Sequence, residues 1–226
     1  MNKPVDQPIL EPKQQSKLQS ILVWDMPVRV FHWLLVLCFT GAWLTAESER
    51  LQMIHYAFGY TACFLVIVRL FWGLVGTKYA RFSQFLKGPK AIVEHFMAML
   101  RGQVHEDLGH NPAGGLVMMA LMLLMLLIGF TGYLTVKETF GDLTSKLHEA
   151  VSSIALGLVV LHVAAALLMS LVQKQNLIRS MITGRKLGLP VQEIRYPQYL
   201  VAILVLAATL YIFISVLTGS LPSLTQ

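Results

Sequence analysis

Five long apolar stretches separated by polar segments dominate the pattern of this chain. Each contains about 20 mostly apolar residues, the length that an α-helix needs to cross a bilayer. The apolar residues follow one another without the alternation of a barrel strand, and a bilayer allows only helices and closed barrels to span it. The pattern therefore predicts five transmembrane helices, at Val28–Ala46, Gln52–Val75, Ala113–Val136, His148–Val172 and Tyr199–Gly219.

The composition also indicates an integral membrane protein. Of the 226 residues, 55% are hydrophobic and 13% are charged, whereas soluble domains contain about 25% charged residues. The polar residues 1–20 are expected to form a flexible tail, because they do not contain the early apolar core of a cleavable signal peptide. Cys38 and Cys63 fall within predicted spans, so they are expected to be packing residues rather than a disulfide. Residues Ala91–Leu100 are expected to form a short amphipathic helix on the membrane surface.

Basic residues gather on one side of the predicted membrane. They precede the first span and fill the segments between spans two and three and between spans four and five, whereas acidic residues prevail in the other two connections. This positive-inside pattern predicts a cytoplasmic N-terminus and an outer C-terminus. The net charge of +6 is therefore a topology signal, and nucleic acid is not an expected partner.

Four histidines, His32, His55, His148 and His162, lie inside or at the mouths of the predicted spans. An ionisable side chain at membrane depth is costly and indicates a functional site. In the predicted orientation, His32 lies near the inner end of the first span and His55 near the outer end of the second. His148 and His162 are fourteen residues apart, so they share a helix face and lie roughly 21 Å apart along the axis.

These histidines form two layers, and each layer takes one residue from the fourth span and one from another helix. Imidazole is a common ligand of haem iron, and two imidazoles on separate helices of a bundle can face each other across a porphyrin. The pattern predicts two bis-histidine sites, His55–His148 near the outer surface and His32–His162 near the inner surface. The sequence contains no C-x-x-C-H motif, so covalent c-type attachment is excluded.

Two arginines are candidate partners of the inner haem. Arg69 lies fourteen residues after His55, so it shares that helix face at the depth of the inner layer. A buried arginine needs a partner, and the hypothesis is that Arg69 pairs with a haem propionate. The alternative is an arginine that snorkels to the cytoplasmic interface, and this alternative is stronger for Arg29.

Some polar and small residues are expected to have simpler roles. His95, His105 and His110 have no ligand-like spacing and are expected to be solvated. Backbone carbonyls are expected to accept from the inner ligands, because no carboxylate is predicted at that layer. Gly129 and Gly132 of the third span are expected to serve helix packing.

The segment VWDMPVRVFHW at residues 23–33 resembles the opening of bacterial di-haem cytochrome b561 proteins. It is also similar to the b-type cytochrome subunit of nickel–iron hydrogenases. The segment RLFWGLVG at residues 69–76 looks like the end of the second helix in that family, and His148 and His162 match its ligand pair on the fourth helix. The resemblance covers about residues 21–186 and implies a four-helix bundle with two non-covalent haem b groups.

The expected fold is thus an all-α integral membrane protein, with a four-helix haem-binding bundle and a fifth C-terminal transmembrane helix. The expected organisation is a cytoplasmic tail at residues 1–20, a di-haem domain at residues 21–186, and a linker with the fifth helix at residues 187–226. The fifth helix contains no histidine, and it is expected to flank the bundle or to contact a partner.

The leading hypothesis is a multi-pass cytochrome of the bacterial inner membrane. It would relay electrons between membrane quinone and a periplasmic cytochrome c or oxidoreductase subunit, in a direction that the sequence leaves open. Alternatives are oxidation of a small reductant such as superoxide at the outer haem, a histidine-containing transporter or proton conductor, and a structural subunit without a cofactor. A proton path would need titratable groups between the layers, and residues 150–161 contain only Val, Ser, Ile, Ala, Leu and Gly.

Overall fold

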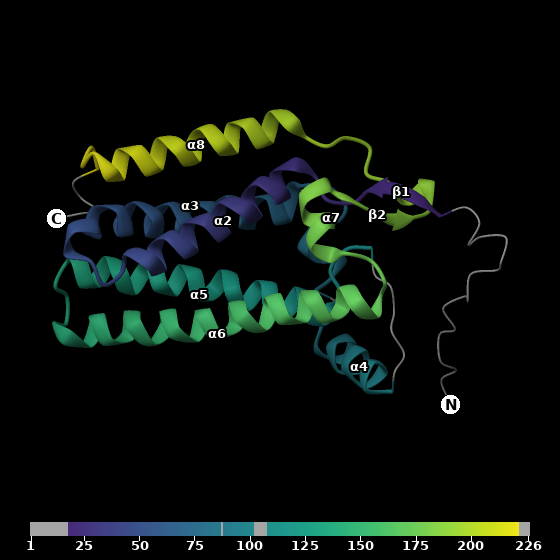
Figure 1. The fold of residues 1–226 in the computed structure, drawn as a ribbon, viewed down its shortest axis with the longest axis horizontal. Helices are drawn as coiled ribbons and strands as arrows, with labels where there is room; N and C mark the ends of the chain where they lie inside the picture. Colours follow the sequence, from purple (N-terminus) through teal and green to yellow (C-terminus); the bar gives the residue numbers. More distant parts are fainter. Residues whose placement is uncertain (1–17, 87, 102–107, 222–226) are drawn as a thin grey trace.

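The computed structural model describes residues 18–86, 88–101 and 108–221. Four long antiparallel helices form a bundle, and a fifth lies along one side of it (Figure 1). Within the described ranges, five helices are long and apolar enough to span a membrane, which confirms the predicted membrane fold. The bundle helices are α2 (Met26–Thr45), α3 (Gln52–Val75), α5 (Pro112–Val136) and α6 (Asp142–Val172), and the fifth is α8 (Tyr199–Leu217).

The starts of two spans follow from local capping. Asp25 precedes α2 and accepts a hydrogen bond from the Val28 backbone N–H at 2.9 Å, and Asn111 caps α5 by accepting from Gly114 at 2.6 Å. A proline follows each cap in the first turn, where its missing N–H is no loss. The start of α6 differs most from the prediction, because polar residues after Gly141 extend the helix ahead of its apolar run.

The inner end of the bundle carries a small cap that the hydropathy pattern did not reveal. Strand β1 (Gln19–Leu22) pairs antiparallel with β2 (Arg185–Gly188). Before β2, α7 (Leu177–Thr183) ends at Gly184, whose φ of +79° suits glycine. The Gly184 carbonyl accepts from the backbone N–H groups of Val23 and Trp24. The cap therefore joins the entry to α2 to the segment that follows α6.

Short helices complete the connections between the spans. The predicted helix between spans two and three is confirmed as α4 (Pro89–Leu100). Single 3-10 turns lie at Glu49–Leu51, Phe82–Gln84 and Pro190–Gln192.

The fifth span, α8, packs against α2 and α3 on the side opposite α5 and α6 (Figure 1). Val205 of α8 is buried in a cluster with Phe31 and Leu65 of the bundle. A largely apolar cavity of about 350 Å³ lies beside this contact, and Arg69 forms part of its wall. The fifth helix therefore flanks the bundle, which agrees with the first of the two expectations for it.

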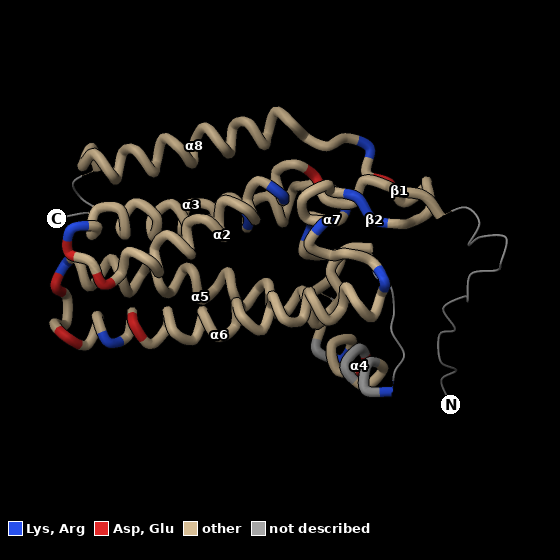
Figure 2. The backbone as a smooth tube through the Cα atoms, viewed as in Figure 1, with Lys and Arg blue, Asp and Glu red and all other residues tan. Residues whose placement is uncertain are grey.

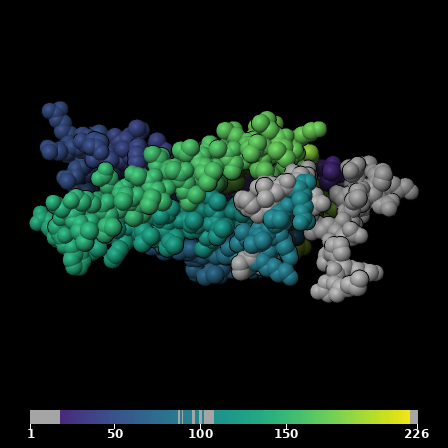
Figure 3. Space-filling view, turned by 90° about the horizontal axis from the view of Figure 1, so that it is seen from below, coloured from purple at the N-terminus to yellow at the C-terminus, as the bar shows by residue number. Residues whose placement is uncertain are grey.

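Helix α6 is the most exposed of the spans, and its surface runs along most of the molecule in Figure 3. It packs along α5 and against α7, and among the described residues it makes no comparable contact with α2 or α3.

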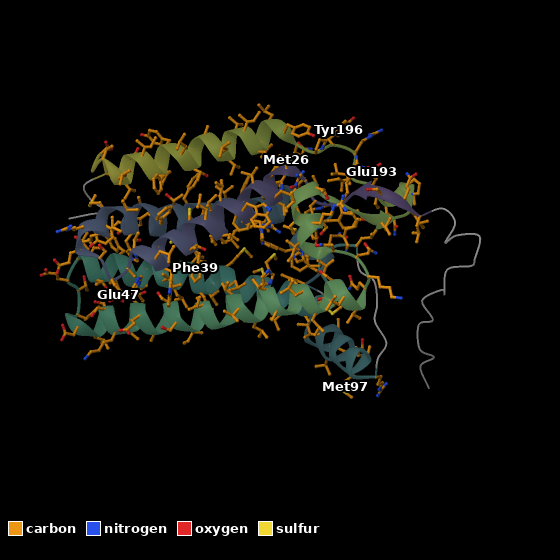
Figure 4. The ribbon with its side chains drawn as sticks, in the orientation of Figure 1. Met26, Phe39, Glu47, Met97, Glu193 and Tyr196 are labelled. Atoms are coloured by element: carbon orange, nitrogen blue, oxygen red, sulfur yellow. The ribbon has the colours of Figure 1, made fainter. Side chains whose placement is uncertain are left out.

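Charged residues mark the two ends of the bundle, and the helices between them are almost free of charge (Figure 2). One end contains the α2–α3 and α5–α6 connections, including Glu47, and the other contains the cap, including Glu193 (Figure 4). These two ends are called the outer end and the inner end below.

Candidate functional site

The outer pair of histidines, His55 of α3 and His148 of α6, face each other across the bundle. Their ring centroids are 6.2 Å apart and their planes are inclined by 75°. The Nδ1 atom of His55 lies 2.8 Å from the Ala42 carbonyl of α2, and that of His148 lies 3.0 Å from the Ile128 carbonyl of α5. All four bundle helices therefore contribute to the position of these two rings.

The carbonyl partners decide which nitrogen of each ring carries the proton. A carbonyl oxygen only accepts, so Nδ1 of His55 and of His148 is the donor in both bonds. Each neutral ring then has its lone pair on Nε2, which is the atom available to a metal. This arrangement of a ligand oriented through its second nitrogen is typical of histidines that hold a metal.

The separation of the outer rings fits one iron between them. A metal–imidazole bond of about 2 Å on each side places the two ligating nitrogens about 4 Å apart and the ring centroids roughly 6 Å apart. The observed 6.2 Å agrees with this value. The outer site therefore offers two imidazole ligands, His55 and His148, which suits an iron already held by a porphyrin.

Two α5 residues hold His148 in place beyond its carbonyl partner. The Thr131 hydroxyl donates to the Leu127 carbonyl at 2.8 Å and lies 3.3 Å from His148 Nδ1, so it can accept from that ring as well. A side chain at Gly132 would come within 3.0 Å of the His148 ring. The prediction of a general packing role for Gly132 is therefore refined, because this glycine makes room for a candidate ligand.

The inner pair, His32 of α2 and His162 of α6, are both half-buried. The His32 ring makes an edge contact with Trp33, with centroids 5.1 Å apart. Its Nδ1 atom is buried and has no hydrogen-bond partner among the described residues. The expectation that a backbone carbonyl would accept from this ligand is therefore wrong for His32.

Arg69 is buried in the bundle at the inner end rather than extended into solvent. Its side chain is 2% exposed, and it lies over the Phe82 ring with 5.1 Å from the guanidinium carbon to the centroid. Nη2 donates to the Ala80 carbonyl at 2.9 Å, whereas Nη1 is buried without a partner among the described residues. A charged group with an unused buried donor fits an anionic ligand.

Arg29 lies at the same end but is only half-buried. Its Nη2 donates to the Ile182 carbonyl of α7, and Nη1 contacts the Met26 sulfur at 3.0 Å. Nε is buried and has no partner in the described part of the chain. Arg29 therefore ties α2 to the cap and keeps one donor free.

Asp25 is a buried carboxylate at this end that the sequence analysis did not anticipate. It is 1% exposed and accepts from Val28 N–H at 2.9 Å, from Trp72 Nε1 at 3.0 Å and from the Thr77 hydroxyl at 2.6 Å. These bonds join the start of α2 to the end of α3. Its position immediately before an apolar helix was the available signal, because aspartate is a preferred N-cap.

The expectation of a solvated residue is wrong for His110. Its ring lies between Trp24, at 4.8 Å, and Phe85, at 4.9 Å between centroids. The side chain is partly buried, and Nδ1 is shielded from solvent without a partner among the described residues. His105 lies outside the described residues, and the structure does not describe the side chain of His95.

Unpaired buried nitrogens are concentrated at the inner end. They belong to Arg29, His32, Arg69 and His110, and in the described residues the remaining buried side-chain atom of this kind is the Thr61 hydroxyl. Leaving a buried polar group unpaired costs about 1–3 kcal/mol. An anionic ligand bound at this end, such as a haem with its propionates, would supply the acceptors that these donors need.

Comparisons with known proteins agree with these observations. The prokaryotic cytochrome b561 family matches residues 23–184, more than half of the chain. A probable Ni/Fe-hydrogenase B-type cytochrome subunit of Rhizobium leguminosarum bv. viciae is 25% identical over 215 residues, with 75% of this chain and 90% of that protein covered. A probable Ni/Fe-hydrogenase 1 B-type cytochrome subunit of Escherichia coli K12 is 23% identical over 152 residues, or 56% of this chain and 64% of that protein.

No solved structure matches the chain. The family match contains all four candidate histidine ligands and excludes α8. By this match the chain belongs to the prokaryotic cytochrome b561 family of membrane b-type cytochromes.

Proposed function

We propose that this chain is a di-haem subunit that relays electrons across the bacterial inner membrane, between quinone and a redox partner on the outer side. The observation that carries this proposal is the pair of facing rings of His55 and His148, separated by 6.2 Å with both Nε2 atoms free to ligate. The bound haem iron supplies reversible one-electron transfer. The polypeptide holds the iron, sets its surroundings and excludes other chemistry.

His55 and His148 are the ligands of the outer haem in this proposal. The backbone carbonyls of Ala42 and Ile128 orient both rings, so the ligands need no rearrangement when the metal binds. If His55 and His148 both bind the iron, they would leave it no position open to oxygen or another small ligand. This arrangement favours electron transfer over reaction at the iron.

His32 and His162 are the ligands of the inner haem. Arg69 donates from Nη1 to one of its propionates, and Arg29 supplies a second positive charge at the same end. Both arginines raise the haem reduction potential, because a nearby positive charge favours the reduced, less positive iron. Since His148 and His162 lie on one helix, α6 connects both sites over roughly 21 Å.

The inner end faces the cytoplasm in this proposal. Exposed basic residues prevail there, and the outer end has more acidic residues, which is the positive-inside arrangement. The named relatives are hydrogenase cytochrome subunits. By analogy, we propose that a periplasmic oxidoreductase subunit or cytochrome c exchanges electrons with the outer haem, and that membrane quinone exchanges them with the relay.

The absorption spectrum of the purified protein tests this function. We expect a b-type α-band after reduction with dithionite, and a pyridine haemochrome assay that gives two non-covalent haems per chain. A chain that holds no haem after expression with a sufficient haem supply would contradict the proposal.

Single-histidine variants test the pairing of the ligands. His32→Ala and His162→Ala should each remove the same haem, and the double variant should remove no more. His55→Ala and His148→Ala should both remove the other haem. Haem content and potentiometric titration distinguish the two sites, and a shared loss in His32→Ala and His55→Ala would show that the layers are assigned wrongly.

A further inference from the structure

His110 is held in a fixed position next to the inner site without being one of its ligands. It immediately precedes the Asn111 cap of α5, and the rings of Trp24 and Phe85 contact it at 4.8 and 4.9 Å between centroids. These contacts constrain the ring plane, so Nδ1 has a defined direction in the interior. This nitrogen is buried and has no partner among the described residues, although buried polar groups are nearly always hydrogen-bonded.

Basic groups lie around His110. Burial and, to a smaller extent, the nearby charge of Arg69 lower its pKa to about 3. At physiological pH the ring is therefore neutral, with one nitrogen that carries a proton and can donate it to a hydrogen bond. The groups whose charges act on it are, in decreasing order, Arg69, His162, Lys186 and His32.

Arg69 keeps a donor that no described protein residue uses, because its Nη1 is buried without a partner in that part of the chain. Asp25 is the buried carboxylate at this end, and its charge acts on Arg69. Both of its oxygens are already engaged by hydrogen bonds from Val28, Trp72 and Thr77. No carboxylate lies within 4.0 Å of the Arg69 or Arg29 guanidinium in the described residues. The site therefore combines a positive field with unused donors, which is the chemistry of an anion-binding site.

We propose that His110 is a positioning residue that donates a hydrogen bond from Nδ1 to a propionate of the inner haem, next to Arg69. The inference rests on the proposed function, because it requires a haem between His32 and His162. A propionate is the anion that this haem brings to the site. The two donors have different roles: Arg69 contributes charge, and His110 contributes a neutral N–H whose direction is set by two aromatic rings.

The sign of the effect on the haem follows from electrostatics. A propionate anion stabilises the oxidised, more positive iron, and a hydrogen bond to the propionate disperses that negative charge. Loss of the bond should therefore lower the reduction potential of the inner haem and leave the outer haem unchanged. We expect this loss to change the reduction equilibrium of the inner haem about tenfold, which corresponds to about 59 mV for one electron.

Two substitutions of His110 separate the hydrogen bond from the packing. His110→Phe keeps a ring between Trp24 and Phe85 but has no N–H. His110→Asn loses the ring but keeps an amide N–H close to the position of Nδ1. A matched control at the same end is Tyr79→Phe, which removes the hydrogen bond from the Tyr79 hydroxyl to the Gln192 carbonyl and should leave both potentials unchanged.

The experiment is a potentiometric titration of each purified holoprotein, with haem content measured in parallel. We expect His110→Phe either to lower the midpoint potential of one haem, by the equivalent of about tenfold in its reduction equilibrium constant, or to lose the inner haem alone. We expect His110→Asn to keep a midpoint close to the wild-type value. Repeating the titration in a His148→Ala background, which should retain the inner haem only, identifies the shifted component.

The outcomes distinguish this inference from the function on which it depends. If wild-type protein holds two haems but His110→Phe leaves both midpoints unchanged, His110 has no bond to a propionate. If both substitutions lower the content of the two haems equally, the His110 ring serves packing only, and the inference is again wrong. Absence of haem from the wild-type protein would instead contradict the proposed function itself.

Discussion

Gly132 is a single residue on which the position of the His148 ring depends. A side chain there would come within 3.0 Å of Cε1 and 3.2 Å of Nδ1, closer than ordinary van der Waals contact. The same displacement would disturb the hydrogen bond from Nδ1 to the Ile128 carbonyl. The outer site therefore needs a residue without Cβ at this position of α5.

We predict that Gly132→Ala selectively lowers the occupancy of the outer haem, several-fold in the purified protein, because insertion of a methyl group into a packed site costs about 1–3 kcal/mol. Gly129→Ala is the matched control on the same helix. A side chain there would clash with Cys63 rather than with a histidine, so it should lower thermal stability without preference for either haem. Equal haem loss in the two variants would argue against a ligand-positioning role for Gly132.

Arg69 offers a second test at the scale of one residue. Because its side chain is 2% exposed and Nη1 has no partner in the described residues, its charge should act on the inner haem at short range. Arg69→Leu is expected to lower the midpoint potential of one haem, with at least a tenfold change in its reduction equilibrium constant, since removal of a positive charge favours the oxidised iron. Arg81→Leu, at an exposed position, is the control. An unchanged redox titration for Arg69→Leu would exclude a propionate contact.

The candidate ligands and the residues that support them differ in how far the sequence could predict them. His148 and His162 could be singled out as candidates because helical geometry converts a spacing into a shared face. The carbonyls of Ala42 and Ile128 were not predictable, since every residue has a carbonyl and only the packing selects one. His110 was missed for a related reason, because its contacts with Trp24 and Phe85 join distant segments.

At the scale of elements, hydropathy predicted the spans well because a membrane helix must be apolar along its length. It could not predict β1 and β2, since strands of four residues have almost no periodicity. These two strands also lie near opposite ends of the sequence, so no local pattern indicates that they pair. The start of α6 was placed too late for the same kind of reason. Its first turns contain Asp142 and other polar residues, and a hydropathy window reads such residues as a loop.

The fifth helix can be tested as a separate element. It contributes no candidate ligand, and it contacts α2 and α3 on the side away from α5 and α6 (Figure 1). We predict that a chain ending at Gln198, which lacks α8, still binds both haems with a reduced midpoint of thermal unfolding. The cut keeps the Pro197 carbonyl, which accepts from the Met26 backbone N–H at the start of α2.

A chain ending at Gln175 is the control for this truncation. It also removes α7 and β2, and with them the Ile182 carbonyl that Arg29 contacts, so the inner haem should be lost before the outer one. Haem content of detergent extracts measures haem retention in both truncated chains, and thermal unfolding of the purified proteins measures the change in stability. If removal of α8 alone abolished both haems, the helix would be an integral part of the bundle rather than a flanking element.

At the scale of the whole molecule, the two proposed haem sites follow one another along α6, because this helix reaches both ends of the bundle. Its 31 residues span roughly 46 Å at 1.5 Å per residue, longer than a bilayer core of about 30 Å. Its first turns therefore extend beyond the apolar layer at the outer end. His148, two turns into the helix, then lies near that surface, and His162 lies closer to the inner surface. The two proposed haem sites would thus serve transfer across the membrane rather than along it.

The orientation of the bundle in the membrane follows from the charged residues at its two ends. Described basic residues prevail at the inner end, in the α3–α5 connection and in the cap, and acidic residues prevail at the outer end (Figure 2). Lysine and arginine in short loops are retained on the cytoplasmic side. The outer haem should therefore face the periplasm, and α8, which runs from the inner end to the outer end, should finish there (Figure 1).

Reporter fusions test this orientation. Alkaline phosphatase is active only in the periplasm, so a fusion after Leu221 should be active, and a fusion after Gln175, between α6 and α7, should be inactive. Fusions to a cytoplasmically fluorescent protein at the same two positions should give the reverse pattern, which controls for expression. If the phosphatase were active after Gln175 instead, His32 and His162 would form the periplasmic site. The proposed periplasmic partner would then have to exchange electrons with the haem beside Arg69.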